Sequence, residues 1–276
     1  MKKILFFDIE TTGLPTSFSI KPSKTEHWPH IVEIAWIISD YDSDVALKEK
    51  RFIVKPEGYQ IPVESSRIHK ITHKKAELEG VSVNFVIEEF LNDLETCNVL
   101  VAHNIEFDKN VIAAELYRQN INPKILNKLL EFCTMKTFTE FCAIPQRGGY
   151  DYKWPTLNEL HQKVFGVKMK KSHSALADVT SVKNCFYELR KSNYFELLTP
   201  EEQAEKEEKL KENEILKQAE AKRKEDNNIF KTFIFFFCLL LLIILIVFGM
   251  NLIIALIISV VLYVILENFY LKNNKK

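Results

Sequence analysis

The chain of 276 residues carries 37 basic and 37 acidic side chains, so its formal charge is zero. This length suffices for one domain of ordinary size with additional segments, and zero charge excludes a global attraction to polyanions. Its 5 cysteines form no CxxC pair, which argues against a disulfide framework or a zinc site and favours reduced, cytosolic thiols. No charged-then-apolar leader precedes the first apolar run, so we expect no cleaved signal peptide.

The first expected strand, Lys3–Glu10, ends in two acids. Because strand side chains alternate between faces, Asp8 and Glu10 project from the same face. Two carboxylates this close repel each other unless a cation lies between them, and such oxygen ligands suit Mg²⁺ or Mn²⁺. An acidic strand end at the surface is the alternative, since so short a motif recurs by chance.

A strand pair is expected after a long loop. The polar stretch 15–30 contains prolines and predicts a loop beside the first strand. Residues 31–39 are rich in β-branched and aromatic side chains, which predicts a strand, and 51–55 is expected to be its hairpin partner. Residues 56–83 are expected to be irregular.

Strands and helices alternate in the middle of the chain. Apolar residues at helical spacing predict a helix over 84–94 with Asn84 as its N-cap. The apolar run 99–102 is typical of a buried parallel strand. Three further helices and a short strand are expected, over about 107–119, 157–165, 175–190 and near Phe132. This order indicates an α/β fold with a sheet of mixed direction.

A polar helix is expected from Pro200 to about Asp226. Thr199 would cap it, with proline at the first helical position and Glu202 completing a capping box. Its surface is polar nearly all round and shows no sustained apolar heptad, which favours a solvated spacer over a coiled coil. Residues 199–228 are therefore a predicted charged linker.

The following run, Ile229–Leu266, carries a single charge, Lys231. A membrane-spanning helix needs about 20 apolar residues, and this run is nearly twice as long. Few polar residues leave no face for water, which argues against a buried pair of soluble helices. The composition therefore predicts insertion into a membrane.

This run is expected to form a hairpin over 229–270. Gly249 and Asn251 interrupt it, and helices of about 230–248 and 252–269 would each just span the membrane. Basic residues flank both ends, namely Lys222, Arg223, Lys224, Lys272, Lys275 and Lys276. Because basic flanks stay in the cytoplasm, a hairpin with both ends inside is favoured over a single tilted span.

Three other polar side chains are candidates for chemistry. Asp108 is expected at the start of the helix after strand 99–102, where a carboxylate is also an ordinary capping residue. His173 and Asp178 lie at the start of the domain's last helix, with Asp178 on its inward side. An inward acid costs free energy unless it is paired or binds a metal; a helix-start His and a surface Asp are the alternatives.

Three segments, in this order and spacing, resemble the exonuclease motifs of the DEDDh family, the group of the proofreading ε subunit of bacterial DNA polymerase III. They are Phe7–Leu14, Ala102–Asp108 and His173–Asp178. Trp28–Trp36 and Trp154–Leu157 are also similar to that family, so the resemblance covers about residues 1–192. It implies an RNase H-like fold, a mixed five-stranded sheet flanked by helices.

The resemblance also implies a 3′→5′ exonuclease that uses two Mg²⁺ or Mn²⁺ ions and releases nucleoside 5′-monophosphates from single-stranded ends. Asp8, Glu10 and Asp178 would hold one ion. Asp8 would bridge to the second ion, which Asp108 would support. His173 would take the proton from the attacking water, a role that its reference pKa of about 6.5 suits.

Residues beside these acids would contact the substrate by the same resemblance: Thr11, Thr12, Leu14, His103, Asn104 and Phe107. Leu14 would wedge against the terminal base, and plain packing is equally compatible with the sequence. Four lysines precede His173 and would meet the substrate backbone or form a solvated loop: Lys163, Lys168, Lys170 and Lys171.

The leading hypothesis is a membrane-tethered exonuclease with its catalytic domain facing the cytoplasm and DNA as the favoured substrate. A nucleic-acid-binding module of the same fold without catalysis is the alternative. The complete polar set argues against it, because a binder does not need five costly groups in one cleft. An exoribonuclease stays open, since a metal site contacts what DNA and RNA share. The sequence leaves a DNA polymerase or repair partner open and does not identify one.

Overall fold

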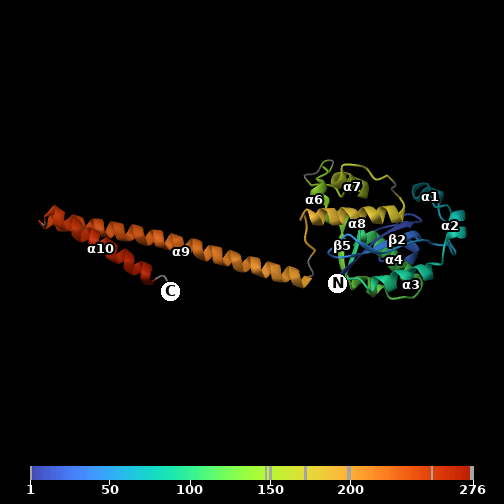
Figure 1. Ribbon diagram of the computed structural model, residues 1–276, viewed down its shortest axis with the longest axis horizontal. Helices are drawn as coiled ribbons and strands as arrows, with labels where there is room; N and C mark the ends of the chain where they lie inside the picture. The colour runs from blue at the N-terminus through green and yellow to red at the C-terminus, as the bar shows by residue number, and fades with distance from the viewer. Residues whose placement is uncertain are drawn as a thin grey trace. The chain divides into compact units, whose positions relative to one another are not determined.

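The computed structural model describes residues 2–146, 148, 151–170, 173–197, 200–249 and 251–273 (Figure 1). The chain divides into two compact units, 1–197 and 198–276. The first is an α/β domain, and the second consists of helices.

The first unit is built on a five-stranded mixed sheet of order β3-β2-β1-β4-β5, which confirms the predicted fold class. Its strands are β1 (Lys3–Thr11), β2 (Ile31–Asp40), β3 (Ala46–Ile53), β4 (Val99–Ala102) and β5 (Leu130–Cys133). The first three pair antiparallel, whereas β1, β4 and β5 are parallel neighbours. The carboxyl ends of β1, β4 and β5 therefore meet at one edge of the sheet, called the carboxyl edge below.

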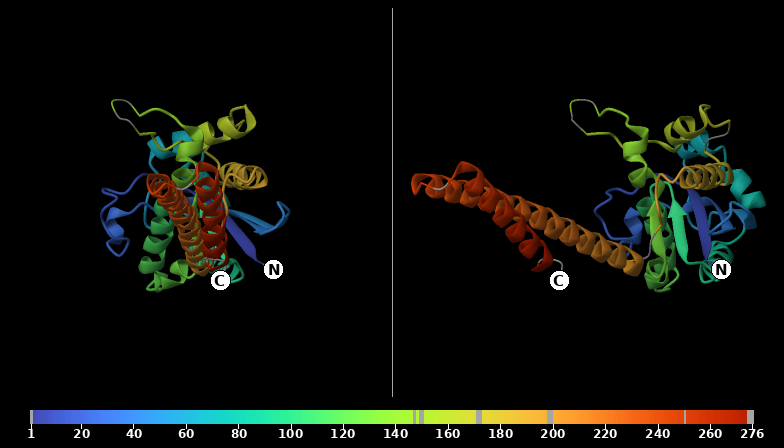
Figure 2. Two further views of the ribbon diagram at one scale, coloured as in Figure 1. Left: turned by 90° about the vertical axis from the view of Figure 1, so that its left-hand side faces the viewer. Right: turned by 60° about the vertical axis from the view of Figure 1, so that its left-hand side comes forward.

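Helices cover both faces of this sheet (Figures 1 and 2). A hydrophobic cluster lies on each face of the sheet, and alternate residues of β1 point into the two clusters. Leu5 and Phe7 pack in one cluster, and Ile4 and Phe6 pack in the other. The first cluster includes side chains of α3 (Val83–Leu94) and α4 (Ile105–Arg118), and the second includes side chains of α7 (Leu157–Phe165) and α8 (Ala175–Lys191). Burial of β1 on both faces explains its nearly continuous apolar sequence.

Shorter helices join these elements: η1 (Thr25–His27), α1 (Val63–His69), α2 (His73–Glu79), η2 (Pro123–Asn127), α5 (Thr134–Thr137) and α6 (Thr139–Cys142). The expectation that 56–83 is irregular was wrong, since α1 and α2 lie there. Each has only seven residues, too few for a hydrophobic period.

Two other boundaries differ from the sequence-based expectation. The N-cap of α3 is Ser82, whose hydroxyl accepts a hydrogen bond from the Phe85 N–H, and not Asn84. β3 begins at Ala46, five residues before the expected 51–55 segment. Its first four residues are exposed, so no buried face marks them in the sequence.

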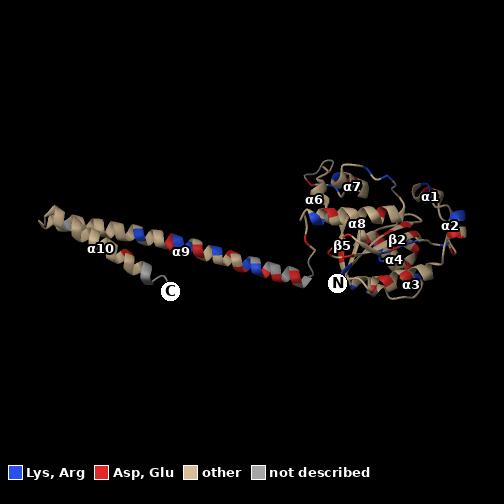
Figure 3. Ribbon diagram, viewed as in Figure 1, with Lys and Arg blue, Asp and Glu red and all other residues tan. Residues whose placement is uncertain are grey.

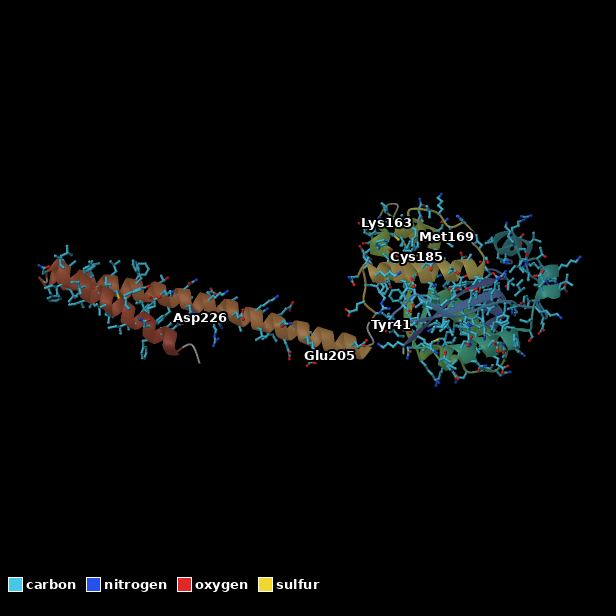
Figure 4. The ribbon with its side chains drawn as sticks, viewed as in Figure 1. Tyr41, Lys163, Met169, Cys185, Glu205 and Asp226 are labelled. Carbon is cyan, nitrogen blue, oxygen red and sulfur yellow. The ribbon has the colours of Figure 1, made fainter. Side chains whose placement is uncertain are left out.

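The second unit consists of α9 (Pro200–Val247) and α10 (Leu252–Asn273), which pack against each other. The expected end of the polar helix near Asp226 was wrong, because α9 is one unbroken helix of 48 residues that continues to Val247. Its charged residues gather in the N-terminal part of the helix (Figure 3). No proline or glycine separates this part from the apolar part. Glu205 and Asp226 project from the charged part (Figure 4). Thr199, Lys275 and Lys276 lie outside the described residues.

Within the described residues, two helical segments are long and apolar enough to cross a membrane, Lys211–Val247 and Leu252–Tyr270. Most of their large apolar side chains are exposed. Gly249, at φ +79°, follows α9 and supplies the left-handed turn conformation that favours glycine.

Candidate active site

Asp8 and Glu10 lie at the carboxyl edge because β1 extends past its parallel neighbour. Phe6 pairs with Val101, so Asp8, two residues further on, is level with the first residue beyond β4. Both acids are half-buried and share one face of the strand.

Asp108 reaches the same place from the start of α4. Asn104 adopts the left-handed conformation (φ 68°) and turns the chain from β4 into this helix. Asp108 then lies in the first turn, buried at 4% exposure, where the helix dipole favours a carboxylate. The Ile9 backbone N–H donates to its carboxylate, which ties α4 to β1.

His173 and Asp178 come from the beginning of α8. His173 has a positive φ of 65°, and its backbone N–H donates to Asp178 Oδ2 at 3.0 Å. Glu10, His173 and Asp178 each offer a ligand atom within 4.8 Å of the others. The second carboxylate oxygen of Asp178, Oδ1, is buried without a hydrogen-bond partner in the described structure. An orphaned carboxylate oxygen in an acidic cluster is the kind of atom that a cation satisfies.

Glu33 holds the start of α8, a role that the sequence analysis missed. Its fully buried carboxylate accepts the Ala175 N–H at 2.8 Å, in place of a side-chain cap from Ser174. Arg51, on the neighbouring strand, donates to the other carboxylate oxygen and forms an ion pair with it. Glu33 also pairs with Glu10 across the sheet. An acid inside the apolar run of β2 was the available signal for this role.

Burial and mutual repulsion make the charged form of these carboxylates unfavourable in the absence of a cation. Burial, followed by repulsion from Asp108, Asp178 and Glu10, raises the pKa of Asp8 well above its ordinary value. Burial, followed by repulsion from Asp178 and Glu33, raises the pKa of Glu10 to about 8. Burial raises the pKa of Asp178 to about 6. Crowded carboxylates of this kind fit a divalent cation, which restores their charged form.

The turn after β1 is braced against the segment before β2. Thr12 exchanges two hydrogen bonds with His30: its N–H donates to the His30 carbonyl, and its hydroxyl accepts the His30 N–H, each at 3.0 Å. Thr11 Oγ1 donates to the Gly13 carbonyl at 2.6 Å. Leu14 is 73% exposed, so it is free of the core and accessible to a ligand.

His103 directly follows β4 at the carboxyl edge. Its Nδ1 is 3.0 Å from Thr134 Oγ1 and its Nε2 is 3.0 Å from the Pro155 carbonyl, so both ring nitrogens have protein partners. Burial lowers its pKa to about 4, which keeps the ring neutral. Phe107 packs near Phe18, with ring centroids 6.2 Å apart.

The predicted basic stretch is spread over two places. Lys168 and Lys170 line a pocket of about 770 Å³ beside α8, together with Arg51 and His161. Lys163 lies in α7 with its ammonium group over the Phe141 ring, and Figure 4 shows Lys163 and Met169 on the α7 side of α8. Lys171 lies outside the described residues.

The exonuclease (RNase T) family matches residues 5–186, more than half of the chain, so the chain belongs to this family. Its motif acids identify it as a DEDD exonuclease domain. The comparison with curated protein sequences finds no match.

Solved structures of bacterial exonuclease I share the fold. The structure of Escherichia coli exonuclease I with a dT13 oligonucleotide has a TM-score of 0.55 and 20% identity, as does exonuclease I of Methylocaldum szegediense. Each comparison covers 70% of this chain and 41% of the other. The zinc-bound E. coli exonuclease I–ssDNA complex has a TM-score of 0.55 and 17% identity, with the same coverage. This chain thus matches less than half the length of these proteins.

Without a metal, the domain is expected to lose stability as pH rises from about 5 to 8. The pKa of Glu10 rises from 4.5 in its ordinary range to about 8, and that of Asp178 from 3.8 to about 6. Between these values the native state binds more protons than the unfolded state, so the free energy of unfolding falls with increasing pH. Thermal unfolding in a chelator measures this slope, and saturating Mg²⁺ is expected to flatten it. An equal slope with and without Mg²⁺ would contradict metal binding by these acids.

Proposed function

We propose that residues 1–192 form a metal-dependent 3′→5′ exonuclease that acts on single-stranded ends, with DNA as the favoured substrate and nucleoside 5′-monophosphates as products. The observation that carries this proposal is the convergence of four carboxylates and His173 at one edge of the sheet, in a chain of the exonuclease family. Exonuclease I structures with single-stranded oligonucleotides support the choice of substrate class. The motif histidine assigns the chain to the DEDDh group, which includes the ε subunit.

Asp8, Glu10, Asp108 and Asp178 would hold two Mg²⁺ or Mn²⁺ ions, and Asp8 would be a ligand to both. Such ions acidify water and neutralise charge on the phosphate. His173 is exposed and has a ring nitrogen within 4.8 Å of carboxylate oxygens of Glu10 and Asp178, where it would take the proton from the attacking water. The braced Thr11–Leu14 turn would hold the terminal nucleotide, with Leu14 against its base.

A labelled oligonucleotide tests this function directly. With Mg²⁺, a 5′-labelled single strand is expected to shorten in single-nucleotide steps, and a 3′-labelled strand to release its labelled mononucleotide first. Matched DNA and RNA strands show which sugar the enzyme prefers. Cleavage of RNA alone would mean that the protein is an exoribonuclease and not a deoxyribonuclease. Tight binding of the strand without any cleavage at any divalent metal would favour the binding module instead.

His173→Ala is expected to slow the chemical step by about 10² to 10⁴-fold, the usual worth of a general base. Metal affinity should change little, because the carboxylates supply the ligands. Single-turnover cleavage measures the first effect, and calorimetric titration with Mn²⁺ measures the second. His161→Ala, at a histidine bonded to Ser181, is the matched control. A large loss of metal affinity in His173→Ala would make this residue a ligand and not the base.

We also propose that 229–270 is a membrane-inserted hairpin with both ends in the cytoplasm. Two contacts between α9 and α10 support a hairpin over a single span. Lys231 Nζ lies 3.1 Å from a carboxylate oxygen of Glu267, and the rings of Phe230 and Tyr270 stack with centroids 3.6 Å apart. These polar and aromatic pairs gather at the open end of the hairpin, where a membrane interface would lie.

A further inference from the structure

An exposed tryptophan lies on the segment that joins α6 to α7. Trp154 is 61% exposed, whereas Trp28 and Trp36 are at most 4% exposed. Lys136 Nζ lies over its ring, 5.9 Å from the ring centroid, and also bonds Glu106 Oε2 at 3.0 Å. An exposed indole with a cation beside it offers a flat apolar surface on which a planar group can stack, next to a positive charge.

The backbone around this ring is fixed although the ring itself is exposed. Lys153 bonds both carboxylate oxygens of Glu159 at 2.7 Å, and Thr156 forms a capping box with the same glutamate. The Pro155 carbonyl contacts His103, whose other ring nitrogen contacts the buried Thr134. The tryptophan is therefore held on a rigid support, as a preorganised binding group would be.

This support belongs to the carboxyl edge that carries the candidate active site. His103 directly follows β4, and Lys136 lies in α5, which directly follows β5. Glu106, the partner of Lys136, is two residues before Asp108 in α4. The aromatic ring thus lies on the β4–β5 side of the acids, whereas the Thr11–Leu14 turn follows β1.

We propose that Trp154 and Lys136 form a subsite for a nucleotide upstream of the 3′ end, with the base stacked on the indole and a phosphate near the ammonium group. This subsite rests on the proposed function, because it needs a single strand with its end among the acids. Stacking on an aromatic ring suits single strands, whose bases are unpaired, and is tolerant of sequence. The lysine supplies a local positive charge, and a chain of zero net charge depends on such local charges for contact with a polyanion.

Tryptophan fluorescence of the full-length protein in detergent tests the stacking without any cleavage. In a chelator, an unlabelled single-stranded oligonucleotide is expected to quench the emission of Trp154, since the two other tryptophans are buried. Trp154→Phe removes this signal while keeping a stacking ring. If the wild-type protein binds a labelled strand but its emission stays unchanged, the subsite is wrong, whatever the enzyme cleaves. If the protein neither binds nor cleaves any single strand, the proposed exonuclease function is wrong, and the subsite that rests on it is wrong as well.

Trp154→Ala is expected to weaken binding of a long single strand by about 5- to 150-fold, the worth of one stacked base. Cleavage of a dinucleotide should change little, because such a substrate does not reach the subsite. Trp154→Phe should restore most of the binding. An equal loss for both substrate lengths, or no recovery with phenylalanine, would overturn the proposal and make Trp154 a structural residue or part of a protein interface.

Lys136→Met tests the phosphate contact separately. The slope of log affinity against log salt is expected to decrease by about 0.7, the value for one phosphate contact on a single strand. Lys74→Met, at an exposed lysine of α2, is the matched control and should leave the slope unchanged. Equal slopes in Lys136→Met and the control would remove Lys136 from the subsite.

Discussion

Asp8→Ala is expected to reduce cleavage by more than about a hundredfold, because this carboxylate lies among all the other acids of the site. The domain should still fold. Removing one of several repelling, desolvated carboxylates relieves a cost of the metal-free state, so the free energy of unfolding in a chelator should stay equal or rise. Single-turnover cleavage and thermal unfolding of the same preparation measure the two effects.

Asp42→Ala is the matched control for this variant. Its carboxylate is 84% exposed and lies 3.5 Å from Arg190, so its loss should leave the cleavage rate unchanged. An Asp8→Ala protein that kept more than about a hundredth of the wild-type rate would be incompatible with a ligand shared by two ions. A variant that lost both activity and folding would instead make Asp8 a structural residue.

The sheet and one part of the site could be predicted from local patterns. The apolar run of β1 and the two-residue spacing of Asp8 and Glu10 depend only on strand geometry, which the sequence displays directly. The convergence of Asp108 and Asp178 on them depends on how α4 and α8 pack, and no local period encodes this. The family resemblance supplied it, and the structure brings the same residues together.

What the sequence did not reveal depends on contacts between distant residues. Glu33 caps α8 from 142 positions away, so its role appears only when β2 and α8 are placed together. The hydrogen bonds of His103 to Thr134 and to the Pro155 carbonyl also join segments that are distant in the sequence, so the sequence did not reveal them. Contact of His103 with a substrate stays a prediction. The continuity of α9 was missed because composition changes at the start of the apolar run while helix propensity does not.

The proposed insertion of 229–270 as a hairpin into a membrane predicts the second large effect, on the labelling of added cysteines. A cysteine added after Lys276, in a chain without its five native cysteines, is expected to resist an impermeant reagent applied to intact cells and to react after permeabilisation. The reason is that basic residues flank both ends of 229–270, while each apolar helix is about 30 Å long, enough for one span. The full-length protein should sediment with membranes, whereas residues 1–197 alone should stay in solution.

Phe248→Cys provides the matched position at the opposite end of the helices, since this side chain is 86% exposed beside the Gly249 turn. It is expected to react from outside intact cells, because the turn of a hairpin reaches the far interface. Labelling of the C-terminal cysteine from outside would leave a single span. Recovery of the full-length protein in the soluble fraction without detergent would contradict the membrane proposal. The exposed apolar side chains of the two helices would then have to be covered by another protein surface.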